Sequence, residues 1–285
     1  MILTNKDVFI LSHVEDTGTR RLENLPSWVP DYSAQPKGVV PNNFKAGASV
    51  RGQQNPELNS RTICVSALFV DVISETAWGP EGHLTSAAHI HRLLEFLASF
   101  PYSYSTEEDK FRVFKETLRI GTRGFPLLEQ LAEVVAGMIT IYKDDNFPAD
   151  SFEKIIRGFK KIDQRGALPS WEKIEDLVNS LQECMKPSQR WRDVPHPVIV
   201  ATKKVLPFRF NGRIFRTKKD YMGIGYLSLK EGDGMWICPQ AKTPFILRKQ
   251  ENGNYRFIGK AYAHGLMLGQ LVESDTGKLE RIRIE

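Results

Sequence analysis

The longest run of alternating apolar and polar positions lies at residues 61–77, RTICVSALFVDVISETA. Ile63, Val65 and Ala67 alternate with polar or smaller residues, and no glycine or proline interrupts the run. A period of two with many β-branched side chains predicts one long strand that is largely buried. Asp71 within this strand needs a hydrogen-bond partner if its carboxylate faces inward.

Residues 86–185 show the period of a helix instead. Ile90, Leu93 and Leu97 fall on one face of a helix. Similar amphipathic stretches follow, and each begins near an N-cap residue or a proline typical of a helix start. Ser170 stands where the N-cap of the last stretch is expected. This pattern predicts four or five helices in the middle of the chain.

From Pro195 onward the pattern turns to short strands at roughly ten-residue spacing. Asn211-Gly212 is a hairpin signal between two of them, and the others are YMGIGYLSL, MWICPQ, TPFILRK, YRFIGKAYAHGLM and KLERIRIE. A barrel of four or five such strands would leave an edge open, and the strand near 62–75 could fill it. We therefore predict an α+β fold, with a helical middle region and a small C-terminal antiparallel β-barrel that includes that long strand.

The same pattern suggests four regions along the chain. They are an extended N-terminal segment at 1–60, the long strand at 61–77, a helical region at 78–194 and the small barrel at 195–285.

The segment NLPSWVPDYS, residues 24–33, has no helix or strand period, and we call it the strap. Its prolines hold the backbone extended. Trp28 and Tyr32 have no element of their own to pack in, so both are expected to dock on another surface. We predict that Trp28 is substantially buried.

The chain has 285 residues and a net charge of +5, but residues 196–285 hold 16 basic and 8 acidic residues. A solvated basic surface explains this excess. An alternative is a nucleic-acid-binding β-barrel, in which basic side chains lie beside aromatic ones: Arg213, Arg216, Lys218, Lys219, Tyr221, Tyr226 and Trp236.

Three cysteines, Cys64, Cys184 and Cys238, form no CxxC pair. Few cysteines in odd number favour reduced thiols in a cytoplasmic or nuclear setting. We expect a cytoplasmic protein without a membrane segment, because the start shows no signal peptide and the apolar stretch at 131–142 is too short to span a bilayer.

Three patterns raise the question of chemistry, and each has a simpler structural interpretation. Gly223 and Gly225 precede no helix, so a bulge or a close backbone approach explains them better than a phosphate loop. A second alternative function is a hydrolase that uses Cys238 and His264, although Cys238 equally suits a small core residue. No cofactor is predicted.

The histidines of the helical region, His83, His89 and His91, also lack the spacing of a metal site. His89 and His91 are two residues apart and would point to different sides of a helix. No cysteine or glutamate joins them in helical register.

Two separated stretches resemble one known family. LPSWVPDYS is similar to a segment that follows the HET domain in fungal heterokaryon-incompatibility proteins, and the series from RIFRTKKDYMGIG to YRFIGKAYAHGLMLGQ resembles their C-terminal region. The residues that carry the resemblance are Pro26, Trp28, Pro30, Asp31, Tyr221, Gly223, Gly225, Gly232, Asp233, Trp236, Pro244, Phe245, Arg248, Gly259, Tyr262, His264, Gly265 and Met267. We call them the signature residues.

The resemblance implies a non-enzymatic regulatory, recognition or scaffold region of a protein for non-self recognition and programmed cell death. Only 24 residues precede Leu25, and the segments typical of the HET domain are not found, so the chain is expected to match the C-terminal part alone. A protein partner or an upstream HET domain is the implied partner, and the oligomeric state is open.

Overall fold

The computed structural model describes residues 24–33, 44–48, 57–59, 61–77, 169–183, 212–274 and 278–285, together with short pieces and single residues elsewhere between 11 and 157. The chain forms two compact units. The first comprises residues 1–82, 103–121 and 211–285, and the second comprises residues 83–102 and 122–210.

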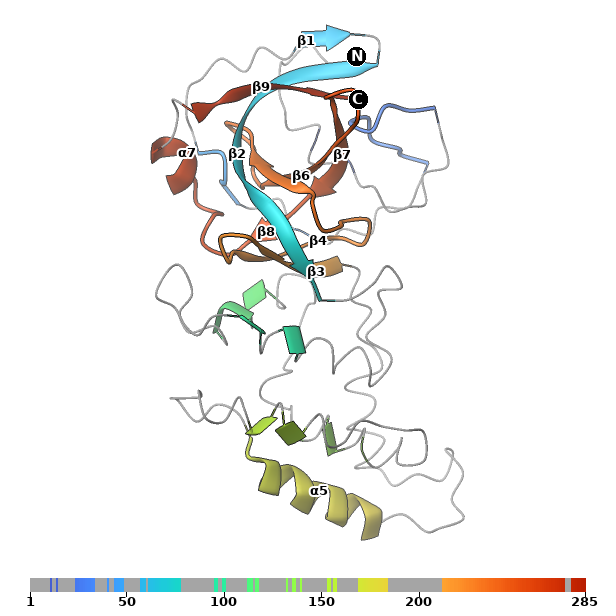
Figure 1. Cartoon of the computed structure of the whole chain (residues 1–285), viewed down its shortest axis with the longest axis vertical. Helices are drawn as coiled ribbons and strands as arrows, with labels where there is room; N and C mark the ends of the chain where they lie inside the picture. Colours follow the sequence, from blue (N-terminus) through green and yellow to red (C-terminus); the bar gives the residue numbers. More distant parts are fainter. Residues whose placement is uncertain are drawn as a thin grey trace. The chain divides into compact units, whose positions relative to one another are not determined.

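The first unit is mostly β-sheet. Its strands are β1 (Glu57–Asn59), β2 (Thr62–Thr76), β3 (Gly212–Thr217), β4 (Met222–Tyr226), β5 (Gly234–Ile237), β6 (Phe245–Lys249), β7 (Tyr255–Lys260), β8 (Tyr262–Ala263) and β9 (Glu280–Ile284). A short helix, α7 (Gln270–Ser274), precedes β9. The predicted long strand is confirmed as β2, a curved strand that spans the sheet (Figure 1).

Five of these strands close into a ring. Strands β5, β6, β7 and β9 pair in turn, and β2 pairs with both ends of the series. Residues 63–67 of β2 lie opposite 280–284 of β9, and residues 68–72 lie opposite 234–237 of β5. This confirms the prediction that the long strand fills the edge left open by the C-terminal strands, and Figure 1 shows the closed arrangement.

The ring is not wholly antiparallel, which corrects the predicted fold. Strands β7 and β9 run parallel and share one residue pair, Tyr255 with Ile284. The Glu285 amide adds a 2.9 Å hydrogen bond to the Tyr255 carbonyl at this seam. Parallel neighbours require a long connection, and the chain between β7 and β9 passes through β8 and α7 before it returns.

Strand β2 pairs with four strands, β1, β3, β5 and β9, and two of these pairings are irregular. Its register shifts between Phe69 and Asp71 against β5, and again between Ile73 and Glu75 against β3. Such bulges bend a strand and increase its twist. The prediction for Asp71 is confirmed, because its buried carboxylate accepts a 2.6 Å hydrogen bond from the Lys219 amide.

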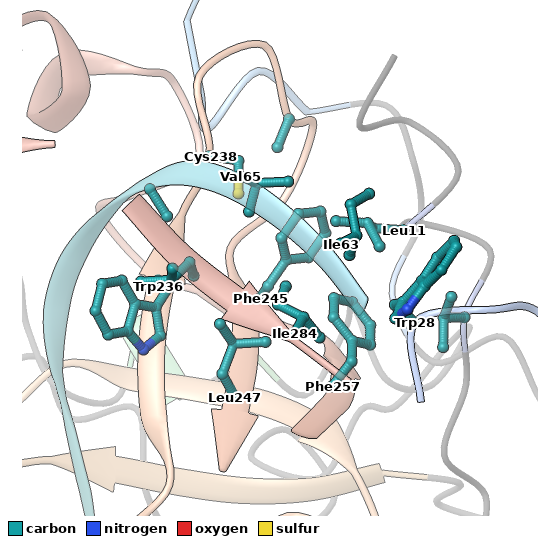
Figure 2. Packing of buried hydrophobic residues seen from close by; sticks show 14 residues of the cluster. Leu11, Trp28, Ile63, Val65, Trp236, Cys238, Phe245, Leu247, Phe257 and Ile284 are labelled. Carbon is teal, nitrogen blue, oxygen red and sulfur yellow. The ribbon is translucent and has the colours of Figure 1, made fainter. Parts of the chain in front are cut away.

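Side chains from all five ring strands form one buried cluster, which is therefore the interior of the ring. Ile63 and Val65 of β2, Phe245 of β6, Phe257 of β7 and Ile284 of β9 are among its members (Figure 2). The opposite faces of β2, β5, β6 and β7 contribute to a second buried cluster with β3 and α7. Because one face of β2 contributes to the interior cluster and the other to the second cluster, much of the strand is buried.

Two boundary predictions in this region are wrong. Gly212 lies inside β3, where it pairs with Tyr226, rather than in a turn. The hairpin between β3 and β4 instead turns at residues 218–221, where Asp220 has a φ of 66°. Asn211 and the strand expected before it lie outside the described residues. The predicted strand YRFIGKAYAHGLM is also divided, because Ala261 separates β7 from β8.

In the second unit the structure describes helix α5 (Trp171–Glu183). Ser170 is its N-cap as predicted, because its hydroxyl accepts a 3.3 Å hydrogen bond from the Lys173 amide. Trp171, Ile174, Val178 and Leu181 form its buried stripe. Most other described residues between 95 and 157 are helical, and the remainder of the predicted helical region lies outside the described residues.

Candidate functional site

The strap is fixed to the ring at the seam between β7 and β9. The Ser27 hydroxyl donates to the Glu285 carbonyl and accepts a 2.8 Å hydrogen bond from the Phe257 amide. The Ser27 amide also donates to the Glu285 carbonyl at 3.1 Å. Because β7 and β9 share a single residue pair, these bonds connect the two strands where their own ladder is short.

Trp28 of the strap is buried in the ring interior, which confirms the sequence prediction. Its side chain is 6% exposed and belongs to the interior cluster. In Figure 2 the indole lies at the edge of that cluster, beyond Phe257 and Ile284. The indole N–H donates a 3.2 Å hydrogen bond to the carbonyl of Arg61, the residue before β2. Trp28 therefore closes one end of the ring.

The corresponding prediction for Tyr32 is wrong, because its side chain is 74% exposed. The turn that carries it is fixed by Asp31, whose carboxylate accepts hydrogen bonds from the Ser33 amide at 3.0 Å and the Ser33 hydroxyl at 2.6 Å. This local capping orders the turn without a surface beneath Tyr32.

Beside the docked strap lies a cavity of about 600 Å³, which we call the strap pocket. Its walls are residues 25–27 of the strap, Arg61 and Thr62 at the start of β2, Gln250 and Arg256 around the β6–β7 turn, and Glu285. This volume lies within the range of ligand sites, roughly 300–1,000 Å³. The strap, which forms one wall, was evident from the sequence, whereas the other lining residues are far apart in the chain and match no motif.

Glu285 contributes an ionised carboxylate to the strap pocket. Its oxygens accept hydrogen bonds from the side-chain amides of Asn254, at 2.9 Å, and Asn252, at 3.0 Å. These bonds hold the pKa of Glu285 below its ordinary value, Asn254 having the larger effect. The carboxylate is therefore directed to the tip of the β6–β7 hairpin.

A second group of signature residues forms an ion pair between a buried carboxylate and a partly exposed arginine. Asp233 is 1% exposed, and both its oxygens accept hydrogen bonds from the Arg248 guanidinium, at 2.7 and 2.9 Å. Arg248 also donates to the Ser228 carbonyl, and the Asp233 carboxylate accepts a bond from the Lys230 amide. The pair thus fixes the loop between β4 and β5.

Arg213 lies close to this ion pair and is itself buried, with 5% of its surface exposed. One guanidinium nitrogen donates a 2.6 Å hydrogen bond to the Leu229 carbonyl. Burial lowers the pKa of Arg213, while the charge of Asp233 opposes that effect. The expectation that Arg213 is a surface cation is therefore wrong.

Two signature glycines make room for aromatic rings. A Cβ at Gly223 would lie 2.3 Å from the Tyr262 carbonyl and 2.4 Å from the Phe215 ring. At Gly259 it would lie 2.2 Å from the Tyr226 ring. The prediction of a close backbone approach at Gly223 is therefore confirmed.

A third signature group closes the turn after β8. The Tyr262 hydroxyl and His264 Nδ1 are 2.9 Å apart, and Met267 Sδ accepts a hydrogen bond from the Ala263 amide. The Met267 carbonyl accepts a 3.0 Å bond from the Lys45 amide, which attaches this turn to residues 44–48.

The remaining signature residues have positions typical of packing and turns. Trp236 and Phe245 are in the interior cluster, and Tyr221 packs against the second cluster. Gly232 and Gly265 have positive φ angles, and a Cβ at Gly225 would lie 2.9 Å from Leu229. The prolines of the set are Pro26, which lines the strap pocket, Pro30 and Pro244.

The structure argues against a hydrolase that uses Cys238 and His264. Cys238 is fully buried in the ring interior, and burial raises the pKa of its thiol to about 12. A thiol in that state is protonated near neutral pH and is not a nucleophile. His264 is instead bonded to Tyr262.

The three histidines of the predicted helical region, His83, His89 and His91, for which no metal site was expected, lie outside the described residues. Among the residues that the structure does describe, no group of three or more histidine, cysteine, aspartate or glutamate side chains could hold a metal ion.

The residues proposed for nucleic-acid binding do not form an exposed platform. Tyr226 and Trp236 are buried, as is Arg213. Arg216 forms an ion pair with Asp220, with a 2.6 Å hydrogen bond. Stacking on bases requires accessible rings, and these two aromatic rings face the protein.

Comparison with known protein families decides the assignment. A family model described as the Het-6 beta-barrel domain matches residues 126–279, more than half of the chain. The chain belongs to the Het-6 beta-barrel family. This confirms the resemblance to heterokaryon-incompatibility proteins that the strap and the C-terminal strands suggested. No curated protein and no solved structure matches it.

The match also places the structural observations in a family context. The Het-6 beta-barrel region covers β3 to β8, and this β-rich part of the chain fits that description, while β2 and β9, which close the ring, lie outside it. The strap and β2 lie before the matched region. Strand β2 closes the ring, and the strap forms one wall of the strap pocket. In the described part of this family member, no helix is long and apolar enough to cross a membrane.

Proposed function

We propose that this chain is a non-enzymatic recognition or scaffold region of a fungal protein for non-self recognition and programmed cell death. Membership of the Het-6 beta-barrel family supports the biological setting. The observation that carries the molecular role is the strap pocket, a cavity of about 600 Å³ on a closed ring. Such a site can hold a partner group without reacting with it.

The arrangement of the pocket supports binding rather than catalysis. Its polar groups are two arginines, one carboxylate, and the hydroxyl and amide groups of Ser27, Thr62 and Gln250. Catalysis by a nucleophile needs an adjacent base within hydrogen-bond reach. Among the described residues that line this pocket there is no histidine, cysteine or lysine, and the Ser27 hydroxyl is hydrogen-bonded to the main-chain oxygen of Glu285 and the amide of Phe257. Guanidinium and amide groups instead favour recognition of polar partner groups.

The proposed function is tested by expression in a fungal host. The chain is produced alone, and separately together with a HET-domain protein that triggers cell death in that host. We expect full viability with the chain alone and an altered death response on co-expression. Robust death caused by the chain alone would refute the non-enzymatic role.

A further inference from the structure

The strap pocket contains a cation whose neighbours leave most of its donors unused. Arg61 donates a 3.3 Å hydrogen bond to the backbone carbonyl of Asn24, which is a neutral acceptor. Among the described residues no carboxylate forms an ion pair with Arg61. The guanidinium has five N–H donors in a planar fork, so one neutral bond leaves room for an anionic acceptor.

The backbone of Arg61 is held in place although its side chain is exposed. Its carbonyl accepts the Trp28 indole hydrogen bond, and the next residue, Thr62, begins β2. The backbone at the mouth of the pocket is therefore held from two sides. A pre-positioned arginine loses less conformational entropy when it binds a partner than one on a loose loop.

The carboxylate already in the pocket is engaged elsewhere. Glu285 accepts hydrogen bonds from Asn252 and Asn254, so its oxygens are partnered by neutral amides rather than by Arg61. Arg256, on β7, lines the same cavity as Arg61. Two arginines and an apolar wall of Leu25 and Pro26 thus face one space.

We propose that the strap pocket binds a carboxylate side chain within an acidic segment of a protein partner. Arg61 and Arg256 supply the guanidinium groups, which match a carboxylate in a bidentate arrangement. Leu25 and Pro26 contact the aliphatic part of the same segment. This site rests on the proposed function, because it gives a recognition region its ligand chemistry.

A protein segment fits the site better than a nucleic acid does. Nucleic-acid affinity depends on several phosphate contacts and on exposed aromatic stacking surfaces. The described residues that line the pocket include two cations, Arg61 and Arg256, which can pair with one carboxylate but do not follow a run of phosphates. Tyr226 and Trp236 are buried and offer no stacking surface.

The binding test uses the full chain and a fluorescein-labelled hexaglutamate peptide, followed by fluorescence anisotropy. Hexaglutamine of the same length is the uncharged control peptide. We expect hexaglutamate to bind and hexaglutamine to bind at least about tenfold more weakly, which equals about 1.4 kcal/mol. The Arg61→Gln/Arg256→Gln variant is expected to lose at least about tenfold in affinity for hexaglutamate.

A matched variant controls for overall charge. Lys218→Gln/Arg283→Gln removes the same two charges from exposed side chains that do not line the pocket. It is expected to change the affinity by less than about threefold, as surface charges contribute little. Equal losses in both variants, or no binding by the wild-type chain, would overturn the proposal. So would stronger competition by an oligothymidine than by unlabelled hexaglutamate.

The host assay separates this site from the proposed function. If hexaglutamate does not bind, yet co-expression still alters the death response, the acidic-segment proposal is wrong and the recognition role stands. If hexaglutamate binds as expected but co-expression changes nothing, the recognition role fails and the site stands.

Discussion

Replacement of Trp28 by alanine tests whether the strap is part of the folded ring. The side chain is 6% exposed and packs with Phe257 and Ile284 in the interior cluster. Burial of a tryptophan removes roughly 150–250 Å² from water, which at about 25 cal/mol per Å² corresponds to about 4–6 kcal/mol. Partial collapse of the cavity reduces this value, and large aromatic-to-alanine changes typically cost about 3–5 kcal/mol.

We therefore expect Trp28→Ala to lower the free energy of unfolding of the strand-containing unit by about 3–5 kcal/mol. Such a loss is a large part of the roughly 5–15 kcal/mol that stabilises a domain. Urea unfolding followed by circular dichroism measures the change. Trp28→Phe keeps most of the apolar contact but loses the indole hydrogen bond to the Arg61 carbonyl. It should therefore lower the free energy of unfolding by less than Trp28→Ala does.

Tyr32→Ala is the matched control, because Tyr32 belongs to the same strap and is 74% exposed. It should change the free energy of unfolding by less than about 0.5 kcal/mol. If Trp28→Ala were as mild as Tyr32→Ala, the strap would not be docked in the ring and the reasoning would be refuted.

Three further predictions concern the signature residues and Cys238. Asp233→Asn should destabilise the chain by about 1–3 kcal/mol, because it weakens the charged hydrogen bonds of a buried carboxylate with Arg248, whose side chain is 28% exposed; urea unfolding checks this, and a loss below about 0.5 kcal/mol, which is typical of a surface substitution, would contradict it. Gly223→Ala should lose more stability than Gly232→Ala in the same assay. At Gly223 the added Cβ meets Tyr262 and Phe215, whereas at Gly232 it meets open space and only the φ of 88° adds strain of about 1 kcal/mol. The reverse order would show that the close contacts at Gly223 are absent. Cys238 should resist alkylation in the native chain and react after unfolding, as measured by mass spectrometry of its peptide. Its raised thiol pKa adds stability that is fully present below the ordinary thiol pKa of 9.0 and is lost as the pH rises toward about 12, so Cys238→Ala should flatten that part of the pH profile.

Much of the strand arrangement followed from local sequence patterns. The period of two at 61–77 identified β2, and the count of C-terminal strands left an open edge that β2 fills. The stretches TPFILRK and YRFIGKAYAHGLM were expected as strands and contain β6, and β7 with β8. These features are local, so a single stretch of sequence contains the information.

The predictions that were wrong concern features that depend on contacts between distant parts of the chain. Asn211-Gly212 is a strong hairpin signal by itself, but pairing with Tyr226 holds Gly212 in β3. The parallel seam at Tyr255 and Ile284 depends on the path through α7, which no short pattern records.

The candidate site shows the same limit. Burial of Trp28 could be predicted because the strap has no element of its own, yet exposure of Tyr32 depends on the absence of a surface beneath one turn. Arg61 and Arg256 match no motif and meet only when the ring closes. Arg213 was read as a surface cation because its sequence neighbours are basic, whereas its position on β3 turns it inward.

The exchange rate of the Phe257 amide hydrogen tests most directly whether the strap seals the ring and forms a wall of its pocket. This amide donates to the Ser27 hydroxyl, so its protection depends on the docked strap. Native-state hydrogen exchange should show Phe257 protected in the wild-type chain and exchanging markedly faster in Ser27→Ala. Rapid exchange of Phe257 in the wild type, or equal rates in both chains, would contradict the account.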